Sequence, residues 1–232
     1  MNNQYTKSLD EIAIECKTDK CSLQHNYCEK YEKYLPFGRD QELKILEIGV
    51  ANGSSLKMWK SFYPNSTVIG VDIDPACIKH QDKQNNVFVE IGSQNDGVFL
   101  TLAAEKYGPL DLIIDDGSHI QSDMIFSFHC LFDLLLKNHG VYIVEDTSSS
   151  YWAELGGAIY APNTCVEFFK SLVDHVNFMG QKLIDSKDPV IQWNWRREDF
   201  HIQQAKNNIN NQCRMNIESI NFLNSTILIT KR

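Results

Sequence analysis

The sequence LIIDDGSH at residues 112–119 decides the fold, because a short apolar run passes directly into an acidic loop. A second run of the same kind, VYIVED at residues 141–146, ends in another acidic pair. Near-continuous Val, Ile and Leu content is typical of buried parallel strands. In an open α/β sheet, ligands bind beyond the carboxyl ends of the strands. The two loops therefore predict one shared site at one edge of a sheet.

Apolar runs alternate with helical stretches through the middle of the chain. We expect strands at 43–48, 67–72, 87–91, 110–114 and 140–145. We expect helices between them and one after them, at 54–63, 75–84, 95–107, 119–136 and 163–178. This alternation favours a parallel sheet with helices on both faces. Two further short strands, at 218–222 and 226–230, predict an antiparallel hairpin.

The predicted fold is α/β: a Rossmann-like, doubly wound, mostly parallel seven-stranded sheet that ends in an antiparallel hairpin. A helical stretch over 8–35, which stops before Pro36, comes before the first strand. A length of 232 residues suits one large domain with a small appendage. We therefore expect a short N-terminal helical segment at 1–36 and a Rossmann-like domain at 37–232.

The composition of the chain limits the kinds of molecule that it is expected to bind. The net charge is −8, from 22 basic and 30 acidic residues, and no block of Lys and Arg exists. This balance argues against nucleic acid and anionic membrane as partners. No stretch approaches the roughly 20 apolar residues of a membrane span. The N-terminus is polar and has no apolar signal segment, so we expect a cytoplasmic protein.

A glycine loop follows the first predicted strand and has the spacing Glu47-x-Gly49-x-x-x-Gly53. Glycines let the backbone turn tightly and approach a ligand closely. The spacing differs from the Gly-x-Gly-x-x-Gly of dinucleotide binders, which hold a pyrophosphate. It is compatible with S-adenosylmethionine, which carries no phosphate. A plain strand-to-helix turn is the alternative for the glycines taken alone.

Two further strand ends carry polar side chains that suit a nucleoside. Asp72 ends the second strand, where an acidic side chain can accept both ribose hydroxyls. Its alternative role is capping, because Asp74 and the proline after it also read as a helix start. Gln94 and Asp96 follow the third strand and could reach the adenine, although capping of the next helix is an equal alternative.

The acidic loops predict a cation site. The fourth and fifth strands are neighbours in a sheet of this kind, so Asp116, Glu145 and Asp146 can converge. Two like charges 4 Å apart repel by about 4 kcal/mol at an effective dielectric of 20. Such a cluster must hold a proton or bind a cation. Oxygen ligands favour Mg²⁺, Mn²⁺ or Ca²⁺ over zinc. Strand-end solvation with capping is the alternative.

His119 lies at the mouth of the same predicted site. An unperturbed imidazole titrates near pH 6.5, which suits a general base. The alternative is a solvent-exposed histidine in the first turn of a helix. We expect Ser118 to be the N-cap of that helix, in a capping box with Gln121.

These motifs resemble the Rossmann-like S-adenosylmethionine-dependent methyltransferases, and within them the macrocin and mycinamicin sugar O-methyltransferases. That group is similar in turn to proteins labelled cephalosporin hydroxylase. The resemblance runs from Thr18-Asp19-Lys20 through residues 69–72 to Glu145-Asp146-Thr147 and Tyr151-Trp152, and resumes in the hairpin. It implies that residues 37–232 form a methyltransferase domain. It also implies site roles: His119 as the base; Asp116, Glu145 and Asp146 as ligands of Mg²⁺ or Mn²⁺; and Glu47, Gly49, Asp72, Gln94, Asp96 and Asp115 as contacts of S-adenosylmethionine.

The sequence thus predicts metal-dependent methyl transfer to a sugar hydroxyl. The sugar could be nucleotide-linked, part of a natural-product glycoside, or part of a capsular or cell-surface glycan made in polysaccharide biosynthesis. Trp193 and Trp195 could stack on the sugar or be partly buried lid aromatics. The alternatives are a catechol-type O-methyltransferase, a hydroxylase-like enzyme and a noncatalytic cofactor-binding protein. The resemblance also suggests a homo-oligomer.

Overall fold

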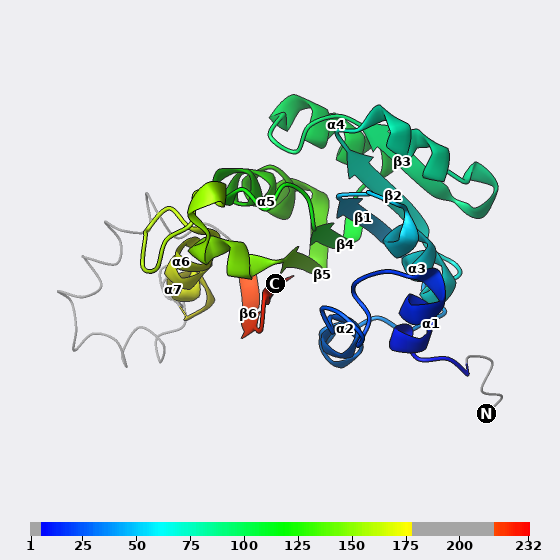
Figure 1. The fold of residues 1–232 in the computed structure, drawn as a ribbon, viewed down its shortest axis with the longest axis horizontal. Coiled ribbons are helices and arrows are strands. Elements are labelled where there is room, and N and C mark those ends of the chain that lie inside the picture. The colour runs from blue at the N-terminus through cyan, green and yellow to red at the C-terminus, as the bar shows by residue number, and fades with distance from the viewer. Residues whose placement is uncertain (1–5, 178–215) are drawn as a thin grey trace, which may run out of the picture.

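The computed structural model describes residues 6–177 and 216–232, which form one mixed seven-stranded sheet with helices on both faces (Figure 1). The strand order is β3-β2-β1-β4-β5-β7-β6. The strands are β1 (Lys44–Ile48), β2 (Thr67–Asp72), β3 (Val87–Ile91), β4 (Leu110–Asp115), β5 (Leu136–Glu145), β6 (Ile217–Leu223) and β7 (Thr226–Lys231). All seven predicted strands are present, and the predicted fold class is confirmed.

The topology creates a switch point between β1 and β4. β1 to β5 pair in parallel, whereas β7 pairs antiparallel with both β5 and β6. The chain runs outward from β1 to β2 and β3, then returns to place β4 on the other side of β1. Ligands of open α/β sheets bind at such a reversal, beyond the carboxyl ends of the strands.

Alternate residues of each central strand enter different cores. Ile45 and Leu112 face a core shared with α1 (Leu9–Cys16), α2 (Cys28–Tyr34) and α3 (Ser54–Phe62). Leu46 and Ile113 face the opposite core. That second core is covered by α4 (Gly97–Tyr107), α5 (Gln121–Leu135) and α6 (Cys165–Ser171). The short α7 (Val173–Asn177) follows α6.

The N-terminal region differs from the single helix predicted over 8–35. It forms two helices, α1 and α2, which are separated by an irregular loop at 17–27. α1 ends because Lys17 adopts a left-handed conformation with φ of 59°. The loop then closes on itself through backbone hydrogen bonds from His25 to Asp19 and from Tyr27 to Lys20. Helical periodicity continued through this stretch, but the chain turns back there.

Two smaller predictions are also wrong. Residues 75–84 form two 3₁₀ turns, η1 (Pro75–His80) and η2 (Lys83–Asn85), and no α-helix. Asp82 interrupts the stretch because its side chain accepts from the Asn85 amide. Ser118 is not the N-cap of α5, since the cap residue is Ile120. The Ser118 hydroxyl accepts instead from the Ile120 amide and donates to Asp123.

Among the residues that the structure describes, no helix is long and apolar enough to cross a bilayer. Trp193 and Trp195 lie outside the described residues, so their predicted roles stay predictions.

Candidate active site

The site begins where two loops touch at the switch point. Gly49 follows β1, and Asp116 follows β4, where its amide donates to the Ile48 carbonyl at 3.0 Å. Gly49 has a φ of 95°, and a Cβ placed on it would lie 2.1 Å from the Asp116 carbonyl oxygen. Only glycine permits this approach. The sequence pattern found this residue because the close contact demands its type.

Asp72 shapes the glycine loop. Its Oδ2 accepts from the amides of Val50 at 2.8 Å and Ala51 at 3.0 Å, and its Oδ1 accepts from the Asp74 amide. Burial acts to raise the pKa of Asp72, but these backbone hydrogen bonds outweigh it and lower the pKa below its ordinary value. Asp72 is therefore an ionised acceptor beside the loop. Its contact with a ribose stays a prediction.

Asp115 is the last residue of β4, and its side chain binds Gln94 and Ser127 rather than Lys20. It is buried, and it accepts from Gln94 Nε2 at 2.7 Å and from the Ser127 hydroxyl. Gln94 in turn accepts from the Ser118 amide at 2.8 Å. Burial raises the pKa of Asp115 to about 7. The pair of Asp115 and Gln94 thus holds the loop that carries Asp116.

The Asp96 side chain caps a helix. It is the N-cap of α4, and its Oδ1 accepts from the amides of Val98 and Phe99. The capping alternative is therefore realised. A contact with the cofactor stays a prediction.

A lysine that the sequence reasoning did not select lies at the centre of the acidic cluster. The Lys20 ammonium is 2.5 Å from Asp116 Oδ2, 2.6 Å from Glu145 Oε2 and 3.4 Å from Glu47 Oε1. Burial acts to lower the pKa of Lys20, but the three carboxylates outweigh it and raise the pKa well above its ordinary value. Lys20 is therefore a fixed cation.

One lysine does not balance the cluster. Burial, and then the Asp116 charge, raises the pKa of Glu145 well above its ordinary value despite Lys20. Burial likewise raises the pKa of Glu47 to about 7, although the Lys20 charge acts to lower it. The cluster therefore holds more carboxyl groups than Lys20 alone can keep ionised, and it must either take up a proton or bind a further cation.

Two tyrosines of the N-terminal region also bind the acidic pair that ends β5. The Tyr31 hydroxyl donates to Glu145 Oε1, and the Tyr27 hydroxyl donates to Asp146 Oδ1 at 2.6 Å. Burial raises the pKa of both phenols, so both remain hydrogen-bond donors. Sequence reasoning missed these residues. Their spacing of one helical turn was the available signal, but it reads equally as a core stripe.

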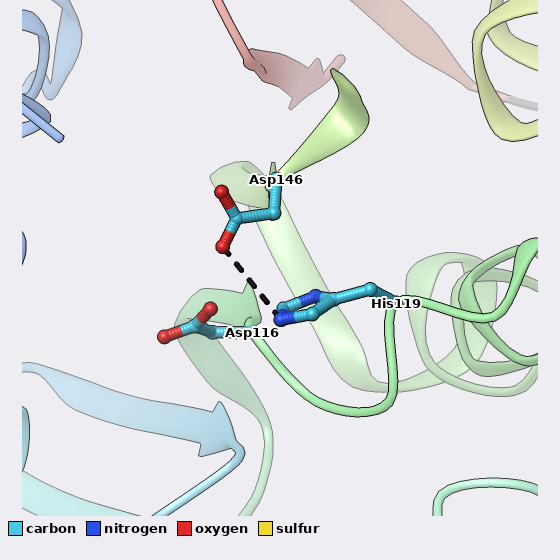
Figure 2. A group of neighbouring side chains, drawn as sticks. All are labelled: Asp116, His119 and Asp146. Carbon is cyan, nitrogen blue, oxygen red and sulfur yellow. Dashed lines mark ion pairs between the residues drawn. The ribbon is translucent and has the colours of Figure 1, made fainter. Parts of the chain in front are cut away.

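The outer part of the site is formed by Asp116, His119 and Asp146, which are neighbours in Figure 2, with the His119 ring facing the Asp146 carboxylate. His119 Nε2 lies 3.6 Å from Asp146 Oδ2. On the other side of Asp146, His25 Nδ1 lies 3.6 Å from Oδ1. All three residues of the outer part are half-buried. The Asp146 carboxylate therefore sits between two imidazoles at the solvent-facing side of the cluster.

Backbone geometry explains why His119 reaches this position. His119 has a φ of 57° and Asp146 a φ of 47°, both in the left-handed region. For residues other than glycine this conformation is sparsely populated and clusters at functional sites. The turn at His119 also delays the start of α5 to Gln121. This strain could not be read from the sequence.

The described residues offer two groups of potential metal ligands that share Asp116. One is Asp116, His119 and Asp146, and the other is Glu47, Asp116 and Glu145. The ligand atoms within each group lie within 4.8 Å of one another. Asp116 belongs to both groups, whereas Glu145 falls only in the buried group and Asp146 only in the outer one, so neither group found among the described residues contains all three predicted ligands. A carboxylate-rich donor set of this kind fits a hard cation.

The strand order and the helix layers are those of the α/β Rossmann-like methyltransferase fold. The MycE methyltransferase from the mycinamycin biosynthetic pathway, solved in complex with Mg, SAH and mycinamycin VI, matches with a TM-score of 0.76. It is 27% identical, and the match covers 97% of this chain and 55% of that chain. The SAH-bound Podospora anserina methyltransferase PaMTH1 matches with a TM-score of 0.50 at 13% identity, which supports the fold alone.

The chain is homologous to sugar O-methyltransferases. L-olivosyl-oleandolide 3-O-methyltransferase of Streptomyces antibioticus is 38% identical over 185 residues, which cover 75% of this chain and 47% of the relative. Mycinamicin VI 2''-O-methyltransferase of Micromonospora griseorubida is 35% identical, over 72% of this chain and 44% of the relative. The chain thus spans about half the length of these relatives. No protein-family model matches it.

Proposed function

We propose that this chain is an S-adenosylmethionine- and Mg²⁺-dependent O-methyltransferase that acts on a sugar hydroxyl. The observation that carries the proposal is the meeting of a glycine loop with a convergent carboxylate cluster at the switch point. The similarity to sugar O-methyltransferases favours this function over catechol methylation, hydroxylation and cofactor binding without turnover.

The methyl donor would lie along the carboxyl ends of β1, β2 and β3. Gly49 lies in the loop directly after β1, and Asp72 is an ionised acceptor suited to the ribose hydroxyls. We assign the remaining donor contacts to Glu47, Gln94, Asp96 and Asp115 on the strength of the resemblance. Glu47 lies at the end of β1, Gln94 and Asp96 follow β3, and Asp115 ends β4, the neighbour of β1.

Asp116, Glu145 and Asp146 would hold the cation. Bound Mg²⁺ would supply Lewis-acid polarisation, which lowers the pKa of a coordinated substrate hydroxyl. His119 would accept the hydroxyl proton at Nε2, the atom that faces Asp146. With that proton removed, the substrate oxygen would form the new C–O bond to the donor methyl as the C–S bond breaks, and S-adenosylhomocysteine would leave. In-line alignment of these groups would contribute strongly to the rate.

The substrate we favour is a natural-product glycoside, because the relatives act on such compounds. Tyr151 and Trp152 follow directly on the acidic loop and are half exposed, which suits stacking on a sugar ring. Capsular and nucleotide-linked sugars are the other sugar substrates that the sequence predicts for the same reaction. A cytoplasmic location and a homo-oligomeric state stay predictions from the sequence.

The test is a methyl-transfer assay with S-adenosylmethionine and a panel of macrolide glycosides, nucleotide-linked sugars and catechols. We expect a methylated glycoside by mass spectrometry, loss of product in EDTA and recovery with added Mg²⁺. Product formation that is undiminished in EDTA, or methylation of catechols alone, would contradict the proposal.

A further inference from the structure

Lys20 connects the ends of three strands from inside the protein. Its side chain is 1% exposed, and it forms ion pairs with Glu47 of β1, with Asp116 after β4 and with Glu145 of β5. A buried charge is costly unless it is paired. Here each carboxylate comes from a separate loop or strand end, so their relative positions depend on a common partner.

The backbone of Lys20 is fixed as firmly as its side chain. Its carbonyl accepts from the amides of Tyr27 and Cys28, at the beginning of α2. Tyr27 and Tyr31 from the same region donate to the acidic pair that ends β5. The loop at 17–27 and the start of α2 therefore form one unit that binds the cluster from a single side.

The contacts of Lys20 leave room for a metal. An ionised carboxylate has about four lone-pair sites, and Lys20 uses one oxygen each of Asp116 and Glu145. Among the described residues, Lys20 is the one hydrogen-bond donor to the Asp116 carboxylate, and it binds Oδ2. Asp116 therefore keeps one oxygen for a cation on the side of His119 and Asp146, whereas both oxygens of Glu145 already have partners, Lys20 and Tyr31.

We propose that Lys20 is a positioning residue, an internal cation that holds the donor-side carboxylate Glu47 and the metal-side carboxylates Asp116 and Glu145 together before Mg²⁺ binds. The inference rests on the proposed function, since it takes Asp116 and Glu145 as metal ligands. Without Lys20, the buried Glu47 and Glu145 and the half-buried Asp116 would face one another with no fixed positive charge, and they would repel.

The test is a double-mutant cycle of Lys20→Met and Glu47→Gln, read by thermal unfolding in EDTA. Glu47→Gln keeps the shape of the side chain and removes one negative charge. We expect Lys20→Met to lower Tm and the added Glu47→Gln to recover at least half of that loss. If Lys20 only fills space, Glu47→Gln brings no recovery, and that result overturns the proposal.

Mg²⁺ provides a second readout. The cation should replace the missing charge, so Mg²⁺ should raise the Tm of Lys20→Met by more than it raises the Tm of the unaltered protein. The matched control is Lys231→Met. Lys231 is also buried, but its ammonium donates to the carbonyls of Phe132, Asp133 and Leu136. Its loss should lower Tm without changing the Mg²⁺ shift.

The outcomes separate this proposal from the proposed function. Equal Mg²⁺ shifts in both lysine variants, or a Lys20→Met protein as stable in EDTA as the unaltered one, overturn the role of Lys20. Failure of both Lys20→Met and the double variant to fold also counts against it, because removal of the Glu47 charge should restore folding. If Mg²⁺ does not change the Tm of the unaltered protein, the proposed metal site is contradicted. The double-mutant cycle in EDTA would still test the role of Lys20, because it requires no metal.

Discussion

Removal of the Tyr31 hydroxyl tests whether the N-terminal region stabilises the acidic site. Tyr31→Phe deletes the donor to the buried Glu145 carboxylate and leaves the ring in the core. A hydrogen bond to a charged group contributes about 1.5–3 kcal/mol to stability. For a domain of this size each kcal/mol changes Tm by about 2–4 °C, so we expect a fall of roughly 3–12 °C.

The assay is thermal unfolding of Tyr31→Phe beside Tyr34→Phe, with and without Mg²⁺. Tyr34 is on the same helix, and no hydrogen bond of its hydroxyl is found in the described part of the chain. We expect Tyr34→Phe to melt near the unaltered protein. The deficit of Tyr31→Phe should shrink in Mg²⁺, because a bound cation compensates the Glu145 charge. Equal melting of the two variants would refute the reasoning.

Three further perturbations have defined outcomes. His119→Ala should lower kcat by about 10²–10⁴-fold with SAH affinity unchanged by calorimetry, and unimpaired turnover would exclude it as the base. Gly49→Ala should lower the free energy of unfolding, measured by chemical denaturation, by more than about 1–3 kcal/mol, because Gly49 has a φ of 95° and the added Cβ would collide with the Asp116 backbone. The control is Gly38→Ala, whose added Cβ would meet no atom closer than 3.9 Å. Burial acts to raise the pKa of Glu90, but hydrogen bonds from α4 outweigh it and lower the pKa below the ordinary 4.5. That carboxylate therefore stabilises the fold above this pH and loses its contribution as the pH falls, so Glu90→Gln should flatten the decline of Tm between about pH 5 and 3.

The sheet was readable from the sequence because each of its strands is a short apolar run with turn residues beside it. Gly49, Asp116 and the acidic pair at 145–146 were readable for a related reason. A close backbone contact demands glycine, and carboxylates directly after two apolar runs are unusual unless they share a ligand. Their residue types, together with their positions directly after apolar runs, identified these residues, and the structure brings them to one edge of the sheet.

The N-terminal contribution was not readable in the same way. Lys20 stands in a polar stretch that gives no sign of burial, and its three partners are distant in sequence. Periodicity continued across the loop at 17–27, so one helix was predicted where the chain turns back. The left-handed backbone at His119 likewise depends on tertiary contacts, and it moved the start of α5 away from Ser118.

The account depends on one cation site formed by the two acidic strand ends beside a methyl-donor pocket. Anomalous diffraction from crystals grown with Mn²⁺ and SAH measures this directly. We expect one strong Mn²⁺ peak bonded to Asp116 and Asp146, with Glu145 in the same coordination group and SAH against the glycine loop at Gly49. A Mn²⁺ peak away from Asp116, or no peak at all with SAH bound, would contradict the account.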